Sequence, residues 1–359
     1  MKWSGYRPWA AVAALALTAL LTGGCGGEDP ADGNAEEPTP LVVTLPLPDS
    51  AFWAGYEIAR GPGGPYDVDY GLEPTTEEAQ DRTFALLELL AGEVDFVVTG
   101  AADAMIASAR GEDVLGVATV HSGLSTIVAT PRSGTRSVRD LGGRVIGVVN
   151  LSGGEVPLLG AALRAEGIDP EAVELRVVGN DQAARRALRR GEIAALAAPR
   201  TAVTLLRQRG IELEPILDDE LADLPTDFLV IRPELEGDPA KLGQVLNLMK
   251  GWYEGTLYGE EFPQDSLQRI CDAAPETCEE PGQARALLRV ALSWSLQEAK
   301  SCGTPDIPAL EAVQSLLEPE APEVAEIDVS DVFVSTYSER MCPDQAVVDA
   351  FANRTGAAR

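Results

Sequence analysis

Residues 85–100 read ALLELLAGEVDFVVTG, and this stretch decides the fold. Its leucines recur at the spacing of one helical face, and Gly92 follows at the position where a left-handed residue ends a helix. Residues 96–98 then form an unbroken apolar run, which is typical of a strand buried on both faces of a parallel sheet. Thr99 and Gly100 leave backbone groups open at the carboxyl end of that strand, where ligands bind in open α/β sheets. The stretch therefore predicts an α/β fold with a binding site at a strand end.

The same order of signals returns at residues 186–199, RALRRGEIAALAAP. It is again a helix, a glycine, a glutamate, an apolar strand and a loop. Any single joint between a helix and a strand can look like this. Two copies in register with the surrounding elements are not expected by coincidence. They predict two similar α/β lobes, each of which offers a strand-end loop to a shared cleft.

Length and charge limit the function classes. A chain of 359 residues can hold two domains of ordinary size. It has 57 acidic and 28 basic residues, a net charge of −29, and no basic cluster that could follow a phosphate backbone. Nucleic acid is therefore not an expected partner. The net charge says nothing about the charge of a ligand, because a cleft has its own local field.

The first 25 residues have the features of a targeting segment. Lys2 and Arg7 precede an apolar run over residues 9–21, which is too short to span a bilayer comfortably and favours a signal peptide. The segment ends LTGGC and resembles a bacterial lipobox, in which Cys25 becomes lipidated and N-terminal, although Thr22 stands where a leucine is usual. Ordinary secretory cleavage, with Cys25 incidental, is the alternative. Residues 26–39 form a flexible polar tether, so we expect an exported protein, lipid-anchored to the outer face of the cell membrane or periplasmic.

The remaining cysteines fit an exported protein. Cys271, Cys278, Cys302 and Cys342 are even in number, which in an oxidising compartment implies two disulfides with three possible connectivities. We favour Cys271–Cys278, across a turn-rich segment, and Cys302–Cys342. Metal ligation is a weak competitor, because the chain has one histidine, His121, and no C-x-x-C motif. We expect no metal and no cofactor.

Strand and helix signals alternate along the first two thirds of the chain, which predicts mostly parallel sheets. The expected strands are residues 41–45, 66–72, 114–120, 125–130, 145–149, 173–178 and 227–231. The expected helices include residues 51–59, with Asp49 or Ser50 as the N-cap, a helix starting at residues 75–78, one ending at 165, and 201–209. From Pro239 onward the patterns are helical only, over residues 241–257, 266–273, 283–300 and 308–317.

Four phrases carry a family resemblance: LAGEVD at residues 90–95, DLGGRVIGV at 140–148, LRAEGI at 163–168 and ALRRGEI at 187–193. They resemble the solute-binding proteins of ABC importers, and most closely the group that handles nitrate, sulfonates, taurine and thiamine-pyrimidine precursors. The resemblance covers residues 41–231 well and the helical tail loosely. Ala194 departs from it, since the family commonly has Asp after the second Gly-Glu.

The resemblance implies a two-lobed, type II-like periplasmic binding protein, with mostly parallel sheets flanked by helices and a helical C-terminal extension. Lobe 1 would be residues 40–124 and lobe 2 residues 125–229, and residues 230–359 would return to lobe 1. Two strands, near residues 122–126 and 227–230, would cross between the lobes, which would close on the ligand by a hinge motion.

Strand-end loops should converge on the cleft. The expected ligand-binding residues are Asp49, Ser50, Phe52, Trp53, Thr99, Gly100, His121, Ser152, Gly153, Gly154, Asn180 and Phe228. Phe52 and Trp53 could instead pack in the core, but neighbours on a helix lie about 100° apart, so one of the two rings is available to a ligand.

Other members of this set also have blander interpretations. The loop at 152–154 opens a helix whose amides and dipole suit an anionic group, or it is a plain N-cap. Asn180 and Asp181 could be turn residues, and a lone histidine such as His121 is more often a structural hydrogen-bonding group. Asp227 and Phe228 lie at the return crossing.

The expected function is that of a lipid-anchored solute-binding protein without catalytic activity. It would capture a small anionic or planar aromatic metabolite, such as a sulfonate, taurine, nitrate or a pyrimidine precursor, and deliver it to ABC permease subunits as a monomer. One alternative is a ligand-sensing partner of a receptor. The other is an enzyme on the same fold, for which a single histidine offers no Ser-His-Asp or Cys-His set.

Overall fold

Two five-stranded sheets organise the computed structural model, which describes residues 39–46, 52–151, 154–180 and 182–357. The predicted signal peptide, the lipidation site Cys25 and nearly all of the tether lie outside these residues. So do four of the expected ligand-binding residues, Asp49, Ser50, Ser152 and Gly153.

The first sheet has the strand order β2-β1-β3-β10-β4. Its strands are β1 (Thr39–Pro46), β2 (Leu72–Ala79), β3 (Phe96–Gly100), β4 (Leu115–Ser122) and β10 (Pro225–Ile231). Strand β1 is parallel to β2 and β3, whereas β10 is antiparallel to both β3 and β4. The lobe boundary expected after residue 229 therefore falls inside a strand of the first sheet.

The second sheet has the order β7-β6-β8-β5-β9. Its strands are β5 (Ser125–Ala129), β6 (Val145–Val148), β7 (Glu174–Val177), β8 (Ala195–Pro199) and β9 (Glu214–Pro215). Strands β6, β7 and β8 are parallel, and β5 is antiparallel to β8 and β9. Each sheet is thus mixed. The antiparallel strand is β10 in the first sheet and β5 in the second, and each directly follows a segment that connects the sheets, residues 223–224 and 123–124 respectively.

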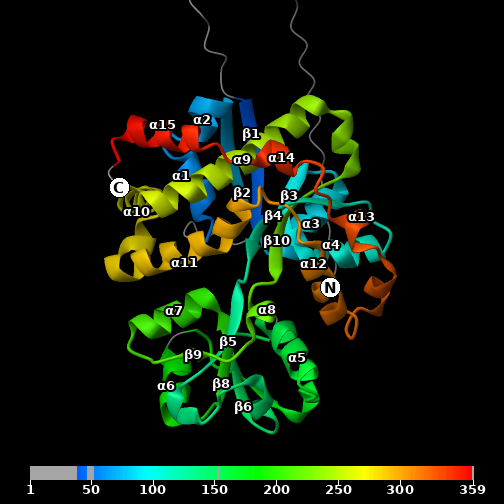
Figure 1. Cartoon of the computed structure of the whole chain (residues 1–359), viewed down its shortest axis with the longest axis vertical. Coiled ribbons are helices and arrows are strands. Elements are labelled where there is room, and N and C mark those ends of the chain that lie inside the picture. Colours follow the sequence, from blue (N-terminus) through cyan, green and yellow to red (C-terminus); the bar gives the residue numbers. More distant parts are fainter. Residues whose placement is uncertain (1–38, 47–51, 152–153, 181, 358–359) are drawn as a thin grey trace, which may run out of the picture. The chain divides into compact units, whose positions relative to one another are not determined.

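Helices flank both sheets, as the alternating sequence pattern predicts (Figure 1). Around the first sheet lie α1 (Ala54–Arg60), α2 (Pro65–Tyr70), α3 (Arg82–Ala91) and α4 (Ala101–Ala109). Around the second lie α5 (Glu155–Ala165), α6 (Gln182–Arg190), α7 (Arg200–Gln208) and α8 (Asp219–Ala222).

The C-terminal third is helical, as expected. Its helices are α9 (Pro239–Glu261), α10 (Pro263–Ala273), α11 (Pro281–Lys300), α12 (Ile307–Leu317), α13 (Val329–Val332), α14 (Ser338–Met341) and α15 (Gln345–Thr355). Helix α9 packs against α1 and α2, α11 against β4, and α12 against α4. The tail therefore packs mainly on the elements of the first sheet, while α11 also contacts α7 and α12 also contacts α5 of the second.

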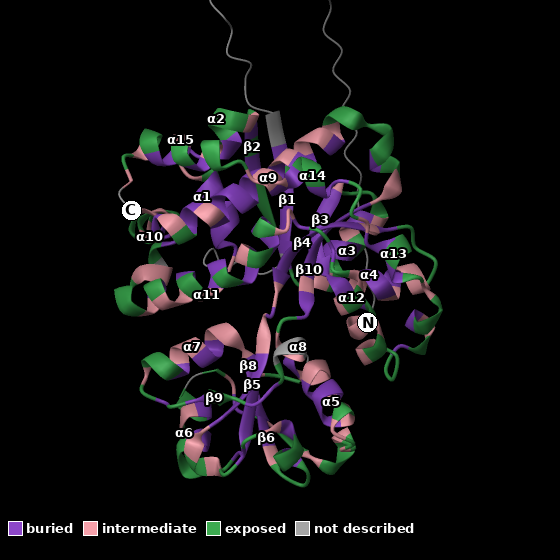
Figure 2. Cartoon of the chain, viewed as in Figure 1, coloured by how far each residue is buried: buried purple, intermediate pink, exposed green. Residues whose placement is uncertain are grey.

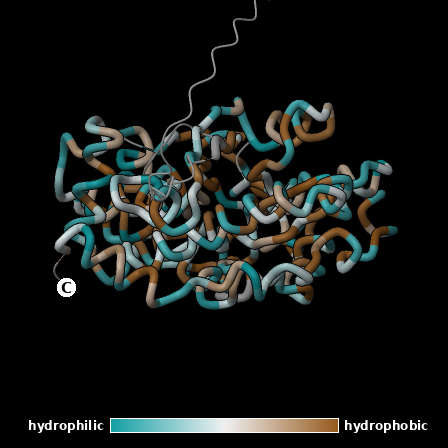
Figure 3. The backbone as a smooth tube through the Cα atoms, turned by 90° about the horizontal axis from the view of Figure 1, so that it is seen from above, coloured by the Kyte–Doolittle hydropathy of each residue, from teal (hydrophilic) through white to brown (hydrophobic). Residues whose placement is uncertain are grey.

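The opening stretch folds largely as its pattern predicts, but Leu87 lies off the buried face of its helix and is 53% exposed, whereas Leu86 and Leu89 are buried. Helix α3 ends at Gly92, whose φ of 74° is left-handed, and all five residues of β3 are buried. Phe96 and Val98 belong to one core cluster and Val97 to another, so β3 is covered on both faces. The second copy behaves alike, because Gly191 has a φ of 65° and the strand that follows it is buried (Figure 2). In Figure 3, hydrophobic and hydrophilic stretches alternate along the backbone, as expected for helices with one buried face.

The prediction for residues 66–79 is wrong. Residues 66–70 belong to helix α2, which begins at Pro65 and ends at Gly71 in the left-handed conformation. The residues where a helix was expected to start, 75–78, lie in β2, which pairs with β1 along its whole length. The next helix starts only after Asp81, whose carboxylate accepts a hydrogen bond from the Phe84 backbone N–H. Pairing with a distant strand overrode the local helix signal.

The disulfide prediction is confirmed. The structure joins Cys271 to Cys278 and Cys302 to Cys342, with Cα–Cα distances of 5.5 Å and 4.3 Å. Within the described part of the chain, no helix is both long enough and apolar enough to cross a membrane.

Candidate ligand-binding site

Three neighbouring strands bring polar residues to one edge of the first sheet. Strand β3 ends at Thr99 and Gly100, and β4 reaches this edge at His121. Because β10 runs the opposite way, its early residue Asp227 lies at the same edge, opposite Gly100 on one side and His121 on the other. The sheet thus brings together side chains that are more than a hundred residues apart in sequence.

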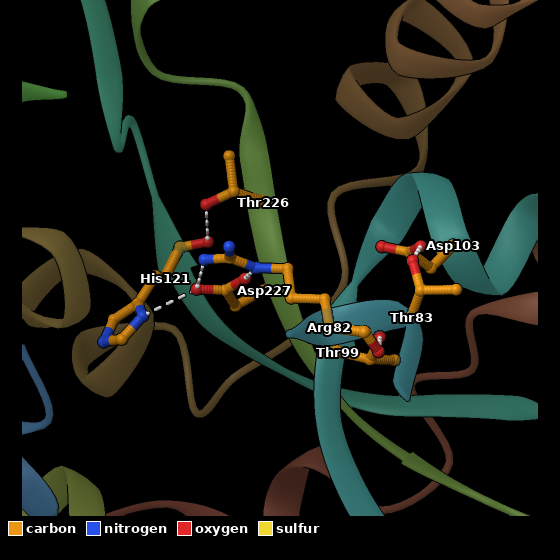
Figure 4. Close-up of polar contacts among 7 residues, drawn as sticks. All are labelled: Arg82, Thr83, Thr99, Asp103, His121, Thr226 and Asp227. Carbon is orange, nitrogen blue, oxygen red and sulfur yellow. Dashed lines mark hydrogen bonds and ion pairs between the residues drawn. The ribbon is translucent and has the colours of Figure 1, made fainter. Parts of the chain in front are cut away.

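Asp227 is the centre of this group (Figure 4). Its Oδ1 accepts a hydrogen bond from Arg82 Nε at 2.5 Å and its Oδ2 one from Nη2 at 3.1 Å. The same Oδ2 lies 3.0 Å from His121 Nδ1. A carboxylate can only accept, so Nδ1 carries the proton in this contact. Asp227 and His121 are buried, whereas the Arg82 side chain is 29% exposed.

The charges in this group follow from its geometry. Burial by itself would raise the pKa of Asp227, but the charge of Arg82 and the hydrogen bonds from His121 and Arg82 outweigh it and lower the pKa to about 2. Burial lowers the pKa of His121 more strongly than Asp227 raises it. The site therefore holds an ionised aspartate, a paired guanidinium and a neutral imidazole at neutral pH.

Short hydrogen bonds fix the backbone around these side chains. Thr99 Oγ1 donates to the Arg82 carbonyl oxygen at 2.8 Å, and Thr226 Oγ1 donates to the His121 carbonyl oxygen at 3.0 Å. Thr83 Oγ1 donates to Asp103 Oδ1 at 2.8 Å, in the first turn of α4. Burial raises the pKa of Asp103, against the hydrogen bond from Thr83 and the charge of Arg82. The start of α3 is therefore tied to both β3 and α4.

An aromatic cluster covers His121 on its other side. Trp53 stacks on the imidazole with ring centroids 5.2 Å apart, and Phe52 meets it edge-on at 5.0 Å. The cluster continues to Trp252 and Trp294. Trp53 is 2% exposed and belongs to the core, whereas Phe52 is only partly buried. Of the two aromatic candidates, Phe52 is the more accessible.

The structure brings together five of the expected site residues: Phe52, Trp53, Thr99, Gly100 and His121. Phe228 lies elsewhere, in the apolar core, with its ring centroid 4.6 Å from that of Phe333. Gly154 is the N-cap of α5 and Asn180 follows β7, so both lie at strand ends of the second sheet, where they are exposed. Their contact with a ligand stays a prediction.

Arg82 is the residue that the sequence analysis did not single out. No local pattern marks it, because it occupies an ordinary first position of a helix and its partner Asp227 lies 145 residues away. The available signal was Asp227, directly before the apolar run 228–231, since an aspartate that is buried with such a strand requires a cation. No group of three or more His, Cys, Asp or Glu residues that could hold a metal occurs among the residues that the structure describes.

Comparisons with known proteins agree with this architecture. The family model described as NMT1/THI5 like matches residues 66–252, more than half of the chain. A comparison with curated proteins found no match.

Several solved structures share the fold. The periplasmic aliphatic sulphonate binding protein SsuA from Escherichia coli has a TM-score of 0.61 and 17% identity, covering 83% of this chain and 92% of its own. The alkanesulfonate-binding protein SsuA from Xanthomonas axonopodis pv. citri, bound to MOPS, has a TM-score of 0.52 and 18% identity, covering 88% and 99%. A Candida albicans gene product with the generic periplasmic binding protein fold has a TM-score of 0.52 and 16% identity, covering 88% and 95%. The chain therefore belongs to the NMT1/THI5-like family and has the periplasmic binding protein fold.

Proposed function

We propose that the protein is an exported solute-binding protein of an ABC importer, which captures a small metabolite in a cleft between two lobes. The observation that carries this proposal is the group formed by Arg82, His121 and Asp227 at the carboxyl end of the first sheet. It lies beside the two segments that cross between the sheets, where ligands bind in open α/β folds. The sulfonate-binding proteins of similar fold support the same class of function.

Arg82 is the proposed contact for a polar group of the ligand. Its pair with Asp227 uses Nε and Nη2, and among the described residues none accepts a hydrogen bond from Nη1. Its side chain is also the most accessible of the three. A carboxylate or sulfonate oxygen would suit this donor. Phe52, at the edge of the aromatic cluster, is the proposed surface for an apolar or planar part of the ligand.

Residues of the second sheet would complete the site. Gly154 lies at the N-terminus of α5, where backbone amides suit an anionic group, and Asn180 follows β7. We propose that residues 40–122 and 225–359 form one lobe, and that the intervening residues form the other. Cys25 would carry the lipid anchor that keeps the protein beside its permease. No catalytic step is proposed.

A thermal-shift screen of the fragment from Gly26 onward tests this function. The panel contains taurine, alkyl and aryl sulfonates, nitrate, hydroxymethylpyrimidine and aromatic carboxylates. A compound at a hundred times its dissociation constant should stabilise the fragment by about 2.7 kcal/mol. Arg82→Lys and Phe52→Ala should each weaken the binding of a hit at least tenfold. Arg139→Ala, which removes an exposed ion pair with Glu166 in the second lobe, should leave it unchanged.

Two outcomes would overturn the proposal. Conversion of a panel compound to a product would indicate an enzyme on this fold. A hit whose affinity is the same in the parent, Arg82→Lys and Phe52→Ala would move the site elsewhere. Labelling with radioactive palmitate in the native host tests the anchor separately, since Cys25→Ser should abolish incorporation without changing affinity for the hit.

A further inference from the structure

Two short segments connect the sheets, and they lie side by side. Residues 123–124 lead from β4 to β5, and residues 223–224 lead from α8 to β10. The Gly123 backbone N–H donates to the Leu224 carbonyl oxygen at 3.0 Å, so the segments are hydrogen-bonded to each other. A rotation of one lobe against the other must be absorbed by backbone angles in these few residues.

Arg200, the first residue of α7 in the second lobe, binds both segments. Its backbone N–H donates to the Leu124 carbonyl oxygen at 2.9 Å. Its Nη2 donates to the Ala222 carbonyl oxygen at 2.8 Å and to Asp223 Oδ1 at 2.7 Å. Arg200 thus ties the second lobe to both segments. Its backbone holds the outgoing segment, residues 123–124, and its guanidinium holds the returning segment, residues 223–224.

Gly123 makes room for this arrangement. Its φ of 68° is left-handed, and a Cβ placed on it would lie 2.9 Å from the Ala222 carbonyl oxygen and 3.0 Å from Arg200 Nη2. A residue with a side chain would meet both an unfavourable backbone angle and a steric conflict with the contact between Arg200 and Ala222. The glycine, the guanidinium and the returning chain are therefore packed as one unit.

We propose that Arg200 is a positioning residue that holds the two connecting segments as a single hinge. The charge pair with Asp223 would by itself be worth little, because that carboxylate is 70% exposed. The contact with the Ala222 carbonyl oxygen differs, since it joins the guanidinium to the backbone at the end of α8, directly before the returning segment. Arg200→Ala removes the two guanidinium contacts but keeps the Gly123–Leu224 hydrogen bond and the backbone contact of residue 200 with Leu124. The two segments are then joined less firmly, and the ligand-free protein samples a wider range of lobe orientations.

The inference rests on the proposed function, because lobe closure has a role only in a protein that captures a solute. Its test uses no ligand, so it can fail or succeed independently of the ligand screen. Hydrogen–deuterium exchange is measured by mass spectrometry on the disulfide-bonded fragment from Gly26 onward. Arg200→Ala should speed exchange at the Gly123 amide at least tenfold. Exchange in β3 and β6 should stay within twofold of the parent.

Control variants distinguish the loss of the Arg200 side-chain contacts from a general loss of stability. Arg139 forms an exposed ion pair with Glu166, at an N–O distance of 2.6 Å, within the second lobe. Arg139→Ala should leave exchange at the hinge unchanged. Asp223→Ala removes the carboxylate but keeps the contact with the Ala222 carbonyl oxygen, so it should have a smaller effect than Arg200→Ala. Arg200→Lys keeps the charge on a shorter side chain and should fall between the parent and Arg200→Ala.

A second measurement follows lobe orientation directly. Spin labels on cysteines placed at Glu171 and Glu311, which are exposed on opposite sides of the hinge, report the distribution of inter-lobe distances. Arg200→Ala should broaden that distribution. Unchanged exchange at Gly123, together with an unchanged distribution of inter-lobe distances, would overturn the proposed role of Arg200. An equal effect in Arg139→Ala would do the same. If Arg200→Ala does not fold, Arg200→Lys and Asp223→Ala decide the matter by the same criteria.

Discussion

Arg82 and Asp227 are joined at two points, Nε to Oδ1 at 2.5 Å and Nη2 to Oδ2 at 3.1 Å, across 145 residues of sequence. The pair connects the first turn of α3 to the start of β10. It therefore links the element that precedes β3 with the strand that returns from the second sheet. Because His121 donates to the same carboxylate, the charge of one buried aspartate holds three elements of the candidate site in place.

Asp227→Asn should destabilise the protein by about 3 kcal/mol, because removing one partner of a buried ion pair leaves the other uncompensated. The measurement is urea unfolding at pH 7. Asp95→Asn is the control, since Asp95 is paired with Lys241 but is 42% exposed, and it should cost no more than about 0.5 kcal/mol. Equal costs for the two variants would contradict a special role for the buried pair.

Stability should fall as the pH rises from about 4.5 through about 7, because of Glu254. Burial, opposed by hydrogen bonds from Tyr70 and the Asp344 backbone N–H, raises the pKa of its carboxyl group from 4.5 to about 7. The folded state thus holds its proton more tightly than the unfolded state. The contribution of Glu254 to the free energy of unfolding is fully present below pH 4.5. It is lost as the pH rises through the folded pKa, and the loss is on the order of 3 kcal/mol.

Glu254→Gln removes this titration, so the variant should lose less stability than the parent between pH 5 and pH 8. Unfolding free energies from urea titrations at several pH values check this. Burial also raises the pKa of Glu298 to about 7, which gives the parent and the variant a common slope. Identical pH profiles in the two proteins would show that Glu254 is not the source.

Gly255→Ala should cost about 3 kcal/mol or more, because helices α1 and α9 touch through their backbones at this position. A Cβ on Gly255 would lie 2.1 Å from the Gly55 carbonyl oxygen, and a rigid backbone cannot yield. Gly243→Ala in the same helix is the matched control. The nearest atom to its Cβ would be Arg340 Nη2 at 3.8 Å, so it should stabilise by about 0.5–1 kcal/mol. Thermal denaturation should shift in opposite directions for the two variants.

The two disulfides should differ in their contribution to stability. Cys302–Cys342 closes a separation of 40 residues and Cys271–Cys278 one of 7. Loop-closure entropy then predicts about 4 kcal/mol for the first and about 2.4 kcal/mol for the second. Replacing each pair by alanines and measuring urea unfolding tests this order. A larger loss from the shorter loop would mean that contacts in the folded state outweigh chain entropy.

The candidate site could be predicted only in part. Thr99, Gly100 and His121 follow apolar strands, and that local pattern is enough to place them at a sheet edge. Phe228 was expected at the site, but it is in the core, because successive residues of a strand point to opposite faces and Asp227 takes the site face. Nothing local to Phe228 distinguishes the two faces.

The sequence by itself determined the elements whose signals are local. The glycine stops at 92 and 191, the apolar strands that follow them and the helical tail are all readable from spacing, because backbone geometry and burial impose short periods on the chain. Tertiary structure alone decided that residues 72–79 pair with β1, that Arg82 meets Asp227 and that Arg200 binds both connecting segments. Each of these depends on which distant groups become neighbours, and a hydrogen bond or a charge pair leaves no periodic trace in the sequence between its partners.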